Sequence, residues 1–114
     1  MSKQQRDKGK RGEQMAVQEL RQVFPSARRK VTNHAGAENG VDLELTGIFR
    51  VQVKNHKRYV PMNAIEEIAD TTGIPLLVSK AERKQWLAVL PLDDLLKILK
   101  LVPGVENESL LQNL

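Results

Sequence analysis

The 114-residue sequence contains no cysteine and no long apolar run. Without cysteine, disulfides and thiolate chemistry are excluded, and a zinc site would need His and carboxylate ligands alone. No apolar stretch approaches the roughly 20 residues that a helix needs to cross a bilayer. The charged start, MSKQQRDKGKRGEQ, leads into no apolar segment, so we expect no secretion signal. We therefore expect no membrane contact and a cytoplasmic protein, in the host cytoplasm if a phage encodes it.

The chain length suits one compact domain with its own core. It contains no internal repeat and no low-complexity segment. We expect a basic flexible arm over residues 1–8, a folded domain over 9–102 and a C-terminal tail over 103–114.

Positive charge is concentrated in the first half of the chain. Residues 1–34 carry nine Lys and Arg against three Asp and Glu, whereas residues 61–114 carry five against eight. A basic block of this kind suits contacts with nucleic-acid phosphates. A solvated segment that keeps the protein soluble is an equally good explanation of the charge alone.

Hydrophobic periodicity predicts three helices and five strands. The predicted helices are 9–24, 61–73 and 91–102, and the predicted strands are 27–33, 41–45, 49–53, 74–79 and 85–90. The last two strands are apolar on both faces and are expected to be central or covered on each side. Leu92, Leu95, Leu96 and Leu99 share one face of the third predicted helix. The fold class is therefore α/β, with a mixed central β-sheet flanked by helices.

The segments VDLEL and FRVQV alternate around a short turn and predict an antiparallel hairpin. Val41, Leu43 and Leu45 are expected to point into the core, with Asp42 on the opposite face. On the second strand, Val51 and Val53 are expected to be inward. Gln52 and Lys54 are then expected on the polar face.

This polar face of the hairpin has the composition of a metal site. Asp42 and Gln52 offer oxygen ligands to a hard divalent cation, and Lys54 is free to orient a water or to stabilise charge on a phosphate. Taken singly, each residue is ordinary on an exposed strand face. Together they indicate a candidate catalytic site.

Glu13 strengthens this hypothesis because it lies on the apolar stripe of the first predicted helix. It precedes Ala16, Val17 and Leu20 by three, four and seven residues. A carboxylate directed at the sheet needs a metal, a cation or a hydrogen-bond donor. The alternative is a Glu of the first helical turn that is directed to solvent and favoured by the helix dipole. We favour membership of the metal site.

The series GKRGE, VDLEL and VQVK, followed by an amphipathic helix and a Trp-containing strand, resembles the PD-(D/E)xK nuclease superfamily. Within it, the chain is most similar to small phage and archaeal Holliday junction resolvases. The resemblance covers residues 9–100. It implies a restriction-endonuclease-like nuclease domain, cleavage of branched DNA in recombination, Mg²⁺ as cofactor with Mn²⁺ as a substitute, and a homodimer.

Carried over by position, Glu13 matches the helix-borne acid, Asp42 the metal-binding Asp and Lys54 the Lys of the E-x-K strand. The implied metal ligands are Asp42, Gln52 and Glu13. Position 52 departs from the family, which usually has Glu there. The Mrr-like branch uses Q-x-K, so Gln52 is compatible with activity, and an engineered Glu replacement is the other explanation. Glu44 is a possible second carboxylate.

Basic and polar residues flank this predicted site and are candidate DNA contacts. They are Lys10, Arg11, Arg28, Arg29, Lys30, His34, Lys57, Arg58 and Tyr59. For His34 an ordinary surface role is favoured, and for Trp86 core packing is favoured over base stacking. Two other functions stay open: a duplex- or flap-cutting restriction or repair nuclease of the same fold, and a DNA-binding module that has lost catalysis.

Overall fold

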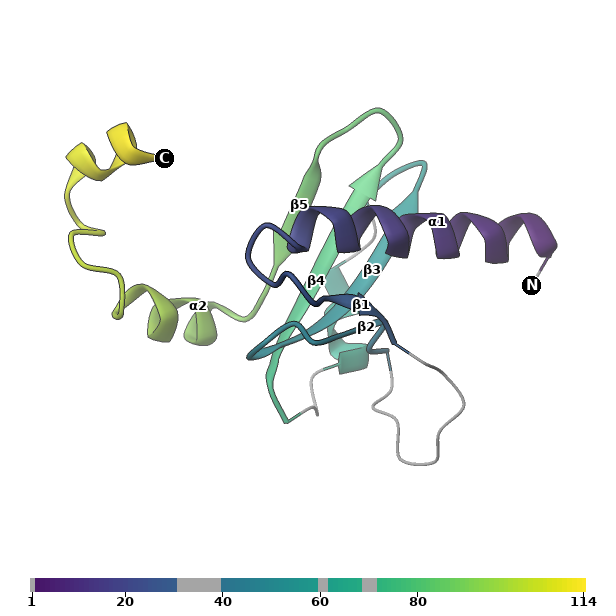
Figure 1. Ribbon diagram of the computed structural model, residues 1–114, viewed down its shortest axis with the longest axis horizontal. Coiled ribbons are helices and arrows are strands. Elements are labelled where there is room, and N and C mark those ends of the chain that lie inside the picture. The colour runs from purple at the N-terminus through teal and green to yellow at the C-terminus, as the bar shows by residue number, and fades with distance from the viewer. Residues whose placement is uncertain (1, 31–39, 60–61, 69–71) are drawn as a thin grey trace.

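The computed structural model describes residues 2–30, 40–59, 62–68 and 72–114, which form a mixed α/β fold (Figure 1). The elements in chain order are α1 (Lys3–Leu20), β1 (Arg28–Arg29), β2 (Leu43–Glu44), β3 (Phe49–His56), the 3₁₀ helix η1 (Met62–Ile68), β4 (Ile74–Ala81), β5 (Trp86–Val89), α2 (Leu92–Leu99) and the 3₁₀ helix η2 (Glu108–Asn113). The predicted α/β class with a mixed sheet is confirmed at this level.

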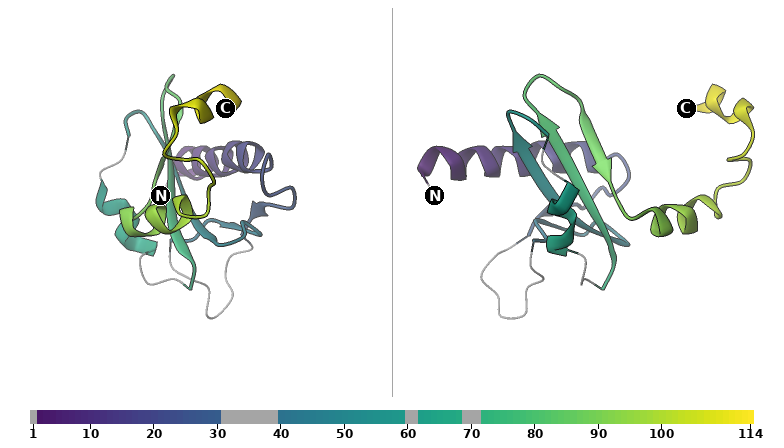
Figure 2. Two further views of the ribbon diagram at one scale, coloured as in Figure 1. Left: turned by 90° about the vertical axis from the view of Figure 1, so that its left-hand side faces the viewer. Right: turned by 180° about the vertical axis from the view of Figure 1, so that it is seen from behind.

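The main sheet has three strands in the order β3-β4-β5. Strands β3 and β4 are parallel, whereas β4 and β5 are antiparallel. A parallel pair needs a crossover connection, and η1 lies in it. Figures 1 and 2 show α1 across one face of the sheet and η1 on the other. The two-residue strands β1 and β2 form a separate antiparallel pair.

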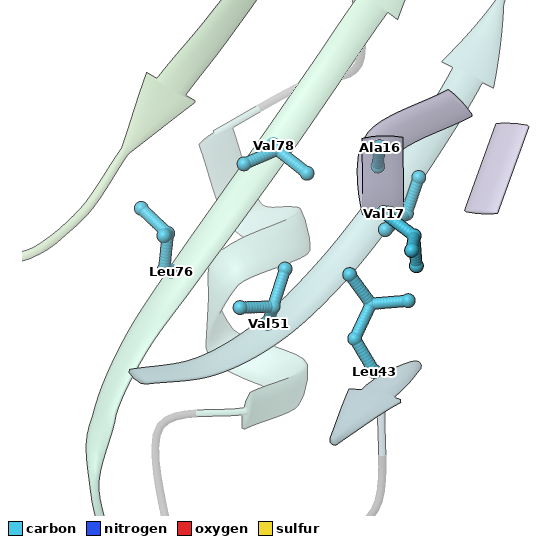
Figure 3. Packing of buried hydrophobic residues seen from close by; sticks show 7 residues of the cluster. Ala16, Val17, Leu43, Val51, Leu76 and Val78 are labelled. Atoms are coloured by element: carbon cyan, nitrogen blue, oxygen red, sulfur yellow. The ribbon is translucent and has the colours of Figure 1, made fainter. Parts of the chain in front are cut away.

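The core lies between α1 and the sheet (Figure 3). Its buried members are Ala16, Val17, Leu43, Val51, Val53, Leu76 and Val78. The alternation predicted for β3 is therefore confirmed on the core side. Trp86 is half-buried and packs against this cluster, as expected of a core aromatic residue.

Helix α1 begins earlier than the periodicity predicts. Ser2 caps it in a reciprocal capping box with Gln5, which satisfies two backbone donors at the helix start. Residues 3–8, expected as a flexible arm, are consequently helical. The helix ends at Leu20, four residues before the predicted end.

The predicted hairpin is irregular. Strand β2 has only two residues and forms its ladder with β1, while a hydrogen bond from the Asp42 N–H to the Val51 carbonyl (2.8 Å) links this segment to β3. Leu45 was expected inward, but it is 54% exposed, because its positive φ of 61° turns the chain out of the strand. Strand β3 also continues past the predicted end, to His56.

One further expectation about the second half is wrong, and one predicted helix is uncovered. Strand β5 is the edge of the sheet, and Leu87 on it is exposed, so β5 is neither central nor covered on both faces. Helix α2 forms where predicted, but none of its residues is buried. Its leucine stripe therefore has no place in the core of this chain. In the part of the chain that the structure describes, no helix is both long and apolar enough to cross a membrane.

Candidate functional site

Asp42 lies beside β3, at the edge of that strand opposite β4. The chain reaches it through Gly40, whose φ of +75° favours glycine and where a Cβ would meet the side chains of Ile68 and Glu67 on η1. The Asp42 N–H donates to the Val51 carbonyl, and its carboxylate Oδ2 accepts the Val53 N–H at 2.8 Å. The backbone and the side chain of Asp42 are thus both held against β3.

Gln52 and Lys54 follow on the face of β3 that is directed away from α1. Their register partners on β4 are Leu77 and Ser79. Gln52 was expected on a polar face, yet it is only 2% exposed, because η1 covers this side of the sheet. The candidate site therefore lies in a partly closed layer between the sheet and η1.

Only one of the two polar atoms of the Gln52 side-chain amide has a hydrogen-bond partner among the described residues. Its Nε2 donates to Glu67 Oε2 at 2.5 Å, whereas its Oε1 is buried and has no hydrogen-bond partner among the described residues. The buried Ser79 hydroxyl also lacks a partner among them. An unpaired buried amide oxygen costs free energy. Both atoms belong to the same layer.

Glu67 is a site residue that the sequence analysis missed. Its spacing, like that of Glu66, predicts exposure to water, and the side chain is 55% exposed, but its carboxylate also accepts from Gln52 and lies 4.0 Å from the Lys54 ammonium. The buried side of η1 is formed by Ala64 and Ile68. Residues three apart are superposed in a 3₁₀ helix, so Glu67 lies above Ala64. A 3₁₀ reading of this segment would have found it.

Glu13 is directed inward, and Arg29 is its partner. The Glu13 side chain is 22% exposed, and its Oε1 accepts from Arg29 Nε at 2.8 Å. The solvent-directed alternative does not hold. A cation from β1 satisfies the carboxylate, so the inward position is explained without a metal ion. Metal binding by Glu13 stays a prediction.

The electrostatic environment of Asp42 is unfavourable to its negative charge. Its pKa is raised from 3.8 to about 6, mainly by burial and also by the charges of Glu13 and Glu67, against the lowering effect of the Val53 N–H. Lys54 lowers it. A carboxylate that faces two other carboxylates in a partly buried site is stabilised by an added cation.

The four predicted catalytic residues thus lie around the middle of β3. Asp42 is at its edge, Gln52 and Lys54 are on its outer face, and Glu13 acts on Asp42 from α1. Glu44, the possible second carboxylate, forms an ion pair with Arg28, whose Nη2 lies 2.7 Å from the Glu44 carboxylate. The two carboxylates that raise the Asp42 pKa are Glu13 and Glu67.

The predicted DNA contacts fall into two groups. Lys57 and Arg58 are exposed just after β3, and the Tyr59 hydroxyl beside them donates to the Gln85 carbonyl at 2.6 Å. Within β3, burial and the charges of Lys54 and Lys8 lower the pKa of His56, which favours its neutral form.

The second group lies between α1 and β1. Its members Arg11, Arg28 and Arg29, together with Arg21, which was not predicted, line an open cleft of about 680 Å³ there. Two of these arginines are in ion pairs, Arg28 with Glu44 and Arg29 with Glu13. Lys10 on α1 is exposed and Lys30 after β1 is half-buried, whereas His34 lies outside the described residues.

The donor set suits a hard divalent cation bound by few protein ligands. Among the described residues, no group of three or more His, Cys, Asp or Glu side chains is placed to hold a metal. The available donors are the Asp42 carboxylate and the unpaired Gln52 Oε1. Mg²⁺ commonly uses one or two protein carboxylates and completes its shell with water and substrate phosphate. Asp42 and Gln52 supply ligand types that fit that pattern.

No protein-family model, no curated protein and no solved structure matches the chain.

Proposed function

We propose that this protein is a metal-dependent DNA endonuclease of the PD-(D/E)xK type that acts on branched DNA. The observation that carries the proposal is the cluster on β3. There Asp42, with its raised pKa, lies at the edge of a layer that also contains Lys54 and the unpaired Gln52 Oε1. The mixed sheet with a helix on each face is compatible with a restriction-endonuclease-like fold.

Asp42 and Gln52 would hold Mg²⁺ or Mn²⁺ through their oxygens. When bound, such an ion supplies Lewis acidity at a phosphate and makes water a better nucleophile at neutral pH. The Val53 N–H orients the Asp42 carboxylate by a 2.8 Å hydrogen bond. Glu67 holds the Gln52 amide by its nitrogen, which leaves the amide oxygen as the free donor.

Lys54 supplies the positive charge of the site. Its ammonium lies 4.0 Å from the Glu67 carboxylate and is half-buried, so it is held near the layer and stays within reach of a bound phosphate. There it stabilises negative charge that develops on the phosphate oxygens. Glu13 acts as a positioning residue, which is anchored by Arg29 and keeps negative charge beside Asp42.

The basic surfaces extend the proposal to a DNA substrate. Lys57 and Arg58 leave the same strand that carries Gln52 and Lys54, so phosphates near the site are within their reach. The arginine-lined cleft between α1 and β1 offers a second stretch for the backbone of a branched molecule. The resemblance to Holliday junction resolvases supplies the preference for branched DNA.

A DNA-binding module without catalysis is the second candidate. It is favoured by the neutral Gln52 and by the absence of a three-carboxylate group from the described residues. Such a protein would bind DNA equally well with and without a divalent cation.

The test is cleavage of a four-way junction, a flap and a matched linear duplex, each with Mg²⁺, with Mn²⁺ and with EDTA. We expect symmetric cuts in the junction with either metal and none with EDTA. Preferential cutting of flap or duplex would assign the restriction or repair activity instead. Binding without cleavage under every condition would establish the non-catalytic module.

A thermal-shift titration gives a second readout that does not depend on cleavage. Mg²⁺ should raise the Tm of the wild type and leave that of Asp42→Asn unchanged, because a ligand that binds only the folded state stabilises it. Asp7→Asn, which changes an exposed carboxylate on α1, is the matched control and should respond like the wild type.

A further inference from the structure

Residues 91–114 form an apolar arm that leaves the domain (Figure 1). Neither α2 nor η2 contains a buried residue. Large apolar side chains are exposed along the whole arm, with Leu92 at 65%, Leu101 at 82% and Leu111 at 69%. Large exposed apolar surfaces are rare in monomeric soluble proteins and are typical of interaction sites.

The same chain has an apolar groove between α1 and β5. It has a volume of about 170 Å³ and is lined by Ala16, Glu19, Leu20, Val78, Trp86, Leu87 and Ala88. Leu87 and the neighbouring Met15 are each 40% exposed. The groove runs along the edge strand of the sheet, where backbone groups face outward.

We propose that the arm of one copy docks into the α1–β5 groove of a second copy, so that two chains exchange arms in a closed dimer. An interface in which each chain offers both an arm and a groove is self-complementary, as two-fold symmetry requires. A stable dimer uses roughly 20–30 residues of each partner, which the arm and groove together supply. This proposal does not depend on the nuclease activity.

The arm is poorly placed to fill the groove of its own chain. Leu90 packs against the core and anchors the chain at the end of β5. Only Pro91, with an extended backbone of φ −59° and ψ 136°, separates it from the first residue of α2. A single extended residue cannot reverse the chain direction, so α2 continues away from β5, as Figures 1 and 2 show.

Charge identifies a second copy of this chain as a fitting occupant. The arm carries Asp93, Asp94, Glu106 and Glu108 against Lys97 and Lys100. The end of the groove near Trp86 is bordered by Lys80 and Lys84 and by one acidic residue, Glu19, so its net charge is positive. An acidic apolar arm therefore meets a basic border, and the complementary charges favour one orientation.

The test begins with the mass of the wild type in solution, by sedimentation equilibrium and light scattering. We expect a dimer of the 12.9 kDa chain. Leu92→Asp with Leu96→Asp in the arm, and Leu87→Asp in the groove, should each give monomers with an unchanged circular dichroism spectrum. The matched control Ile48→Asp changes an apolar side chain of comparable exposure on the β2–β3 turn and should stay dimeric.

Cysteine cross-linking distinguishes an arm that docks on a second chain from an arm that folds back on its own chain. No native cysteine interferes, because the sequence has none. Leu96→Cys mixed with Ala88→Cys should give a disulfide-linked pair of chains. A wild-type monomer would overturn the proposal, as would a single chain carrying both Leu96→Cys and Ala88→Cys that closes the disulfide within itself. A dimer that survives both charge-introducing variants would also overturn it.

Discussion

At the scale of single residues, the candidate site is built at the expense of stability. Asp42 is kept beside two carboxylates in a half-buried position, and Gln52 keeps an amide oxygen unpaired. Neither the Asp42 carboxylate in this position nor the unpaired Gln52 oxygen stabilises the folded chain by itself. Groups held in this way are typical of sites that await a ligand.

Replacing Asp42 by Asn should therefore abolish cleavage and stabilise the protein in EDTA. The folded wild type keeps its Asp42 proton up to about pH 6, whereas the unfolded chain loses it near 3.8. The free energy of unfolding accordingly falls as pH rises between these values, by roughly 3 kcal/mol at most. Asn removes this loss and can still accept the Val53 N–H.

The measurement is urea denaturation of both proteins from pH 3 to 8. The advantage of Asn should be absent below the lower pKa, grow between the two values and stay constant above pH 6. A variant that is less stable than the wild type at pH 7, or one that cleaves normally, would contradict the assignment of Asp42.

Gln52→Glu should strengthen Mg²⁺ binding and lower the Mg²⁺ midpoint for cleavage, because a charged oxygen attracts a dication more than an amide does. Glu and Gln are nearly isosteric, so the change in packing should be small. The structure adds a cost, because a carboxylate at position 52 cannot donate to Glu67 and would face its negative charge. Without metal, we expect a loss of about 1–3 kcal/mol in the free energy of unfolding.

The matched control is the double variant Gln52→Glu with Glu67→Gln. It exchanges donor and acceptor across the same 2.5 Å contact and keeps the number of carboxylates constant. It should regain most of the lost stability. Equal Mg²⁺ midpoints in the wild type and in Gln52→Glu would place residue 52 outside the metal shell.

At the scale of elements, the contact between α1 and β3 positions Glu13. A Cβ at Gly12 would lie 2.6 Å from the Asn55 Cβ, so only glycine permits this approach. Gly12→Ala should destabilise the fold by about 1–3 kcal/mol and weaken cleavage by displacing the helix that carries Glu13.

Gly9→Ala is the control on the same helix. Nothing lies within 4 Å of a Cβ at residue 9, so alanine should stabilise α1 by about 0.5–1 kcal/mol. Urea denaturation of the two variants measures both effects. If they changed stability in the same direction, the close contact would not constrain the helix.

The basic segment after β3 should contribute to DNA binding through phosphates. Replacing Lys57 and Arg58 by Gln is expected to weaken binding to junction and duplex alike. It should flatten the log–log salt dependence by about one unit for each lost contact. Lys97→Gln with Lys100→Gln removes the same charge from α2 and the residue after it, and should leave the slope unchanged. Titrations in EDTA measure binding without cleavage. Equal slopes in both variants would show that Lys57 and Arg58 do not contact DNA phosphates.

At the scale of the whole molecule, the arm makes stability depend on association. If folded chains exchange arms, dilution removes part of the stabilising contact, so the Tm of the wild type should rise with protein concentration. The variant with Leu92→Asp and Leu96→Asp should have a Tm independent of concentration. Differential scanning calorimetry over a dilution series measures this, and a flat series for the wild type would contradict the exchange.

The local pattern of the sequence determined much of the sheet and part of the site. Alternation along 49–54 was enough to predict that Val51 and Val53 are buried in the core and that Gln52 and Lys54 share the other face. It was enough because successive side chains of a strand point to opposite faces, whatever surrounds them. The apolar spacing of α1 predicted the inward position of Glu13 in the same way.

Only the tertiary structure decided the partners of these residues. Glu67 reaches Gln52 because a crossover brings η1 over the outer face of the sheet, and Arg29 reaches Glu13 because β1 lies beside α1. The exposed edge of β5 and the uncovered leucines of α2 were equally unpredictable. Periodicity identifies which side chains share a face. It cannot identify what covers that face, because the covering group comes from a distant part of the chain or from another molecule.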